Sequence, residues 1–70
     1  MNETIEVFKA LYKELFDENQ NLKICGRDKC RQLIILAKNI KDDDFGNIKH
    51  GMLNIDKIKD LYIELTKDNN

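Results

Sequence analysis

The sequence contains no proline, no tryptophan and no serine, and only three of its 70 residues are glycine. A chain so poor in proline and glycine is neither collagen-like nor linker-like, because both classes depend on these residues. The absence of serine removes the nucleophile of a Ser-His-Asp triad, and His50 is the single histidine. We therefore expect a protein that is not an enzyme.

Long apolar runs are also missing. The longest extends from Leu33 to Ala37, a run of five residues, whereas a helix that spans a bilayer needs about 20. Residues Met1 to Thr4 lack the basic stretch that opens a secretory signal peptide, and no long apolar run follows them. These features predict a cytoplasmic protein that makes no contact with a membrane.

Charge is nearly balanced over the whole chain but is unevenly distributed along it. Twelve basic and 13 acidic residues give a net charge of −1, which by itself predicts neither nucleic-acid nor membrane binding. The segment 23–41, however, contains a single acid, Asp28, whereas the segments on either side are acidic. The cations of this basic segment are Lys23, Arg27, Lys29, Arg31, Lys38 and Lys41.

Apolar residues recur with the 3.6-residue period of an amphipathic helix in the segments 3–18, 27–41 and 54–67. In the second segment large apolar residues fill positions 33–36, which is typical of a helix with neighbours on two sides. The sequence therefore predicts an all-α fold, a small three-helix bundle formed by residues 1–70 as a single domain. The expected core residues are Ile5, Phe8, Leu11, Tyr12, Leu15, Phe16, Cys30, Leu33, Ile34, Leu36, Ala37, Ile40, Ile55, Ile58, Leu61, Tyr62 and Leu65.

Between the second and third predicted helices lies a segment, 42–53, that is too apolar for a free loop. Asp43 or Asp44 is a suitable N-cap for a helix, and Gly51 is a suitable residue just after a helix C-terminus. This combination predicts one extra short helical turn between the second and third helices.

The start of the second predicted helix carries three cations, Arg27, Lys29 and Arg31, in its first turns. Cations there oppose the helix macrodipole, so their presence needs a reason. One interpretation is a site for an anion or an acidic partner, with Ile35 as an apolar anchor. The other is ion pairing with Asp17 and Glu18 at the end of the first helix. The candidate partner-binding residues are Lys23, Arg27, Lys29, Arg31 and Ile35, and Val7 and Ile63 are expected to be exposed as well.

Metal binding has little support in the sequence. Cys25, Cys30 and His50 are types of residue that bind zinc, but their spacing does not match a zinc motif. The acidic segment that begins at Lys41 does not match an EF-hand calcium loop. With Gly46 at the glycine position, Lys41 and Phe45 fall at positions where calcium needs oxygen ligands. We expect no metal and no cofactor. Cys30 is interpreted as a core residue and Cys25 as a linker residue.

Size, an apolar central helix and segregated charge together predict a small helical protein-interaction module without catalytic activity. Such compact regulators or inhibitors include small proteins of phages and mobile elements that block a host factor. Its partner would be another protein, with an acidic surface favoured. The first alternative is a nucleic-acid-binding protein that uses the basic segment 23–41. The second is a homodimeric structural module, because a domain of this size buries only about 60% of its unfolded surface.

Overall fold

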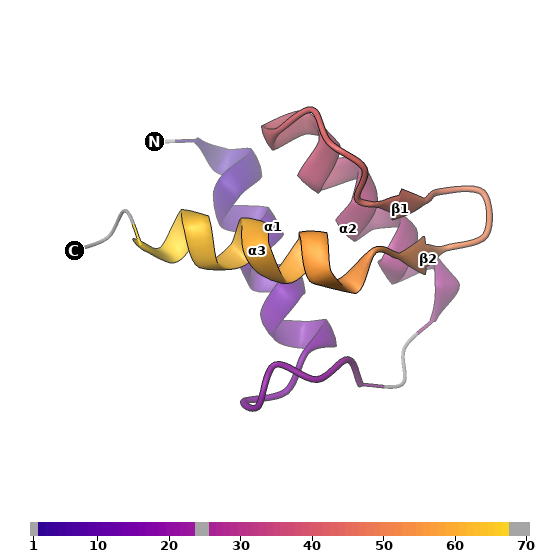
Figure 1. Cartoon of the computed structure of the whole chain (residues 1–70), viewed down its shortest axis with the longest axis horizontal. Coiled ribbons are helices and arrows are strands. Elements are labelled where there is room, and N and C mark those ends of the chain that lie inside the picture. Colours follow the sequence, from indigo (N-terminus) through magenta and orange to yellow (C-terminus); the bar gives the residue numbers. More distant parts are fainter. Residues whose placement is uncertain (1, 24–25, 68–70) are drawn as a thin grey trace.

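Three helices and a short β-hairpin form the fold, which the computed structural model describes for residues 2–23 and 26–67. The fold is therefore mostly helical, as the sequence predicted. It is not cleanly all-α, because it also contains a two-stranded hairpin. The hairpin lies between the second and third helices and in front of the second (Figure 1). In chain order the elements are α1 (Glu3–Leu15), α2 (Arg27–Ile40), β1 (Gly46–Asn47), β2 (Met52–Leu53) and α3 (Ile55–Lys67).

Helix α1 ends at Leu15, three residues before the predicted end. Phe16 has an extended backbone and forms an isolated antiparallel bridge with Leu22. The Asp17 carboxylate accepts hydrogen bonds from two backbone N–H groups of the following turn, at 2.8 and 3.0 Å. A side chain that bonds to nearby backbone in this way competes with continuation of the helix. The polar residues after Phe16 therefore form a turn.

Helix α2 is the central element, as predicted, because it packs against α1, both strands and α3 (Figure 1). Of its four consecutive large apolar residues, Leu33 and Ile34 are fully buried, whereas 46% of Ile35 is exposed. Helices α1 and α3 add buried residues to the same core. The fully assembled core comprises Phe8, Tyr12, Leu15, Phe16, Leu33, Ile34, Ala37, Phe45, Ile58 and Leu61.

The segment 42–53 forms the hairpin β1–β2 instead of the predicted helical turn. Gly46 pairs with Leu53 and Asn47 pairs with Met52 in an antiparallel register. Gly46 and Gly51 both have positive φ, 133° and 63° respectively. A left-handed glycine serves a hairpin turn as well as a helix C-terminus. The prediction that Gly51 adopts a left-handed conformation is therefore confirmed, but Gly51 lies in a hairpin turn and not at the end of a helix.

The hairpin is closed at its base by contacts with the start of α3. The Asn54 side-chain amide donates to the Asp44 backbone carbonyl at 3.0 Å, and the Asn54 N–H donates to the Phe45 carbonyl at 3.0 Å. The Asn54 side chain thus holds the residue pair before β1 beside the start of α3, and Phe45 is buried in the core.

Candidate partner-binding surface

The basic residues predicted to act as one group are directed to different parts of the fold. Lys29 forms an ion pair with Glu14 of α1. Within residues 2–23 and 26–67, neither Asp17 nor Glu18 joins an ion pair, so the predicted pairing across the connection involves a different acid. Lys23 lies exposed after α1 and donates its backbone N–H to the Leu15 carbonyl at 2.8 Å. Lys29 therefore binds within the fold and does not converge with the other cations.

Arg31 holds the hairpin against α2. Its Nε donates to the Ile48 carbonyl at 3.0 Å, and its Nη2 donates to the Lys49 carbonyl at 2.7 Å. Hydrogen bonds from a charged donor are stronger than neutral ones. A further contact with Asp28, at 3.6 Å, is too exposed to contribute much. Arg31 is thus a positioning residue for the hairpin turn.

Arg27 lies beneath the same turn. A Cβ atom added to Gly51 would lie 2.4 Å from Arg27 Cγ and 3.0 Å from the Arg27 carbonyl oxygen. The turn of the hairpin therefore rests directly on the first turn of α2. Arg27 itself is exposed, and its stem lies against the hairpin turn at Gly51.

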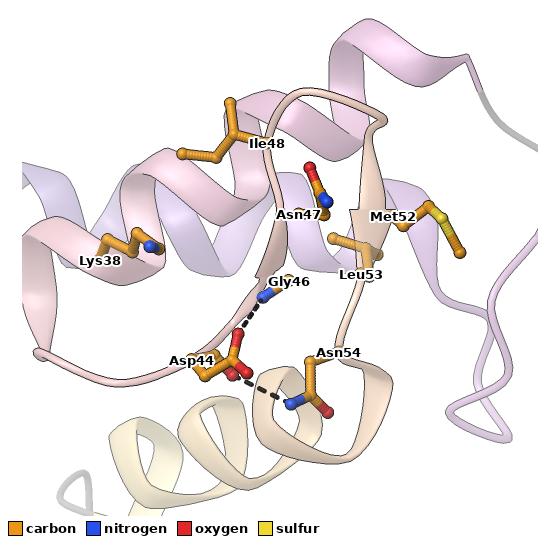
Figure 2. Close-up of a pocket in the computed structure, with 8 residues that line it drawn as sticks. All are labelled: Lys38, Asp44, Gly46, Asn47, Ile48, Met52, Leu53 and Asn54. Atoms are coloured by element: carbon orange, nitrogen blue, oxygen red, sulfur yellow. Dashed lines mark hydrogen bonds between the residues drawn. The ribbon is translucent and has the colours of Figure 1, made fainter.

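An open groove of about 640 Å³ lies where α2 meets the hairpin (Figure 2). The Lys38 side chain points from α2 toward the hairpin (Figure 2), and Ile48 and Met52, 37% and 65% exposed, contribute apolar surface. Ile35 lies on the same face of α2, one turn after Arg31 and one turn before Lys38. The residues that line the groove are Lys38, Asp44, Gly46, Asn47, Ile48, Met52, Leu53 and Asn54.

We call the resulting surface the α2–hairpin face. Three of its members are apolar and three are cations. No ion pair joins these three cations to an acid within the described ranges of the chain. The nearest acid in the groove is Asp44, whose carboxylate accepts from the Gly46 N–H at 3.3 Å. The α2–hairpin face consists of Arg27, Ile35, Lys38, Ile48, Lys49 and Met52.

Between α2 and α3, in contrast, charges of opposite sign meet. Lys41 pairs with Glu64 at 3.4 Å, and Lys57 pairs with Asp43 at 3.1 Å. The N–H of Asp44 and the Lys57 ammonium lower the pKa of the Asp43 carboxyl below its ordinary value. The lysines on this side of the molecule are therefore neutralised within the fold, whereas those of the α2–hairpin face are available to a partner.

Sequence reasoning found part of this surface and missed part of it. Ile35 is exposed, as predicted, and so are Val7 and Ile63, each 52% exposed, on α1 and α3. Ile48 and Met52 were missed, because their segment was expected to form a helical turn. The alternation of exposed and half-buried positions in the hairpin is too short for a periodicity signal.

The described residues offer no further site for a metal. Within residues 2–23 and 26–67 no group of three or more His, Cys, Asp or Glu side chains is placed to hold an ion. Cys30 is buried in the core, as predicted, whereas Cys25 lies outside the described residues. In the same ranges, no helix is both long enough and apolar enough to cross a bilayer.

Comparisons with protein-family models, with curated proteins and with solved structures find no match for this chain. No resemblance therefore assigns a role to any residue, and the α2–hairpin face is defined by its geometry and charge.

Replacing Arg31 with methionine should loosen the hairpin while leaving the helices in place. The variant keeps most of the apolar stem but loses the two bonds to backbone carbonyls, so we expect the free energy of unfolding to fall by about 1–3 kcal/mol. Hydrogen exchange should become faster at the amides of residues 46–53. Lys29→Met is the control, because its exposed ion pair is worth only about 1 kcal/mol or less. Equal exchange in both variants would contradict the positioning role of Arg31.

Proposed function

We propose that this protein is a small, non-catalytic interaction module that binds another protein through the α2–hairpin face, as a regulator or inhibitor of a cellular factor. The observation that carries the proposal is the exposure of Ile35, Ile48 and Met52 beside three cations. Contiguous apolar patches on a protein surface are uncommon and often mark interaction sites. Cations around such a patch steer a partner and select it by charge.

Nucleic-acid binding receives less support from the same surface. A surface that reads bases needs polar side chains directed at base edges, whereas Ile35 occupies the exposed centre of α2. Arg31, a suitable side chain for phosphate, already donates to two carbonyls of the hairpin turn. The Asp44 carboxylate in the groove would repel a phosphate backbone.

A symmetric dimer through this face is also less favoured. A two-fold interface places the same patch of each copy against the other. Lys38 and Lys49 would then meet cations of the second copy at a partly desolvated interface, and like charges oppose such pairing. A partner that carries acids fits the face better than a second copy of this chain does.

The groove itself supports a binding role more than a catalytic one. Among the residues that line it, only Lys38 and Asp44 carry ionisable side chains. A nucleophile with an adjacent base, the arrangement that covalent catalysis requires, is not part of this lining. The groove is also open to solvent, whereas efficient catalysis benefits from exclusion of water.

Affinity purification from the native host with matched surface variants tests the proposal. The face variant combines Ile35→Ser with Lys38→Glu, and the control combines Val7→Ser with Lys13→Glu on α1. All four side chains are exposed, so each substitution should change stability by only about 0.5 kcal/mol. We expect a protein that survives nuclease treatment and is captured by the wild type and the control but not by the face variant.

Two results would overturn this function. One is tight binding of a duplex oligonucleotide, with a logarithm of affinity that falls steeply with the logarithm of salt concentration. The other is a sedimentation mass of twice 8.3 kDa that reverts to the monomer mass in the face variant.

A further inference from the structure

The groove of the α2–hairpin face has two different walls. Helix α2 supplies Lys38, and the hairpin supplies Ile48 and Met52. Ile35 is exposed on the same face of α2, one turn before Lys38. With about 640 Å³ of open space between the two walls, the groove accepts side chains that project from a larger partner. Its apolar side chains come from the hairpin and its ammonium group from α2, so an occupant of the groove meets apolar surface on one side and a cation on the other.

The charges around the groove are ordered along it. Lys49 lies at the hairpin turn and Arg27 at the start of α2, beside that turn. Lys38 lies farther along α2, and Asp44 lies at the base of the hairpin, next to Asn54 (Figure 2). Negative groups of an occupant are therefore favoured from the turn to Lys38 and disfavoured beside Asp44.

Resting on the proposed function, we infer that the α2–hairpin face binds an acidic segment of another protein. One or two apolar side chains of this segment contact Ile35, Ile48 and Met52, and its carboxylates lie near Lys38 and Lys49. Buried apolar anchors supply most of the affinity in such an interface. The exposed charge pairs mainly set specificity and the association rate.

This occupant also explains why the hairpin is held so close to α2. Arg31 fixes the turn through the Ile48 and Lys49 carbonyls, which orders the backbone that carries these two side chains before a partner arrives. A surface ordered in advance loses less conformational entropy on binding. Arg31 stays bonded to the hairpin and adds no charge contact of its own to the partner.

Selection from a display library of random 12-residue peptides on the folded full-length chain tests the inference. Counter-selection on the Ile35→Ser, Lys38→Glu variant removes peptides that bind elsewhere. We expect the enriched peptides to contain more Asp and Glu than Lys and Arg, together with at least one large apolar residue. Synthesised peptides are then titrated against wild type and single variants at two salt concentrations.

The expected result is a rise in Kd of about fivefold or more for Lys38→Glu, for Lys49→Glu and for Ile35→Ser. Lys13→Glu on α1 should change the Kd less than about twofold, because an exposed charge distant from the interface is screened by salt. Raising the salt concentration should weaken binding to the wild type more than binding to Lys38→Glu.

Failure of the inference and failure of the proposed function give different results. Enriched peptides that are neutral or basic but still depend on Ile35 would overturn the acidic occupant and leave the protein-binding function intact. Absence of any enriched peptide that depends on the face would also overturn the inference. If, in addition, a duplex oligonucleotide binds and Lys38→Glu abolishes that binding, the proposed function itself is wrong.

Discussion

Replacing Gly46 with alanine is expected to destabilise the protein by about 2–4 kcal/mol, from backbone strain and overpacking together. Gly46 has a φ of 133°, which a residue with a side chain rarely adopts. Its added Cβ would lie 2.2 Å from the Met52 carbonyl oxygen and 3.0 Å from the Asn54 nitrogen. Both atoms are backbone, so relief requires β1 to separate from β2. Urea denaturation followed by far-UV circular dichroism measures the loss.

The other two glycines provide graded controls for this experiment. Gly26 has no atom within 4 Å of an added Cβ, so Gly26→Ala should shift stability by only about 0.5 kcal/mol. Gly51 has a φ of 63° and a movable Arg27 side chain as its closest neighbour, so Gly51→Ala should cost about 1–2 kcal/mol. Equal urea midpoints for Gly46→Ala and Gly26→Ala would show that the hairpin does not have this register.

The helices were predictable because apolar residues recur along each of them with the 3.6-residue period of a helix. Phe8, Leu33 and Ile58 each lie on an apolar stripe of the sequence, and each is fully buried. The end of α1 was less predictable, because the Asp17 carboxylate stops the helix through bonds to the turn that follows. Such a local bond leaves no trace in the apolar pattern.

The hairpin was missed for a different physical reason. A pair of two-residue strands is marginal by itself and depends on tertiary contacts. Those contacts come from Arg31, which is 17 and 18 residues from the carbonyls that it binds, and from burial of Phe45. Sequence alone does not indicate such distant contacts. It also did not indicate that Lys29 would pair with Glu14 and Arg31 with the hairpin, which removes both from the predicted cationic group.

The α2–hairpin face therefore depends on the core beneath it. Ile34 is fully buried and Ile35 is exposed, so adjacent residues of α2 serve the core and the surface separately. On the hairpin, Phe45 anchors the strand in the core while Ile48 remains accessible. A substitution that disturbs this core should weaken partner binding indirectly, which is why the binding variants proposed above are confined to exposed side chains.

Replacing Tyr12 with alanine is expected to lower the free energy of unfolding by about 3–5 kcal/mol, the usual cost of truncating a buried aromatic residue. Tyr12 is 2% exposed and stacks between Phe16 and Tyr62, with ring centroids 4.3 and 3.9 Å away. Its removal leaves a cavity between α1 and α3. The total stability of a chain of this length is about 4–10 kcal/mol, so this loss is a large part of it. Urea denaturation followed by circular dichroism at 25 °C should show a strongly lowered midpoint.

Tyr12→Phe is the matched control, because it keeps both stacked contacts and removes only the hydroxyl. That hydroxyl donates to Gln20 Oε1 at 2.6 Å, so its loss should cost about 1 kcal/mol. Burial, together with Tyr62, raises the pKa of Tyr12 above its ordinary value of 10.0. Ionisation thus opposes folding, and the wild type should lose stability as the pH rises past about 10, whereas Tyr12→Phe should lose less. A Tyr12→Ala protein as stable as Tyr12→Phe would show that the stacked rings contribute little.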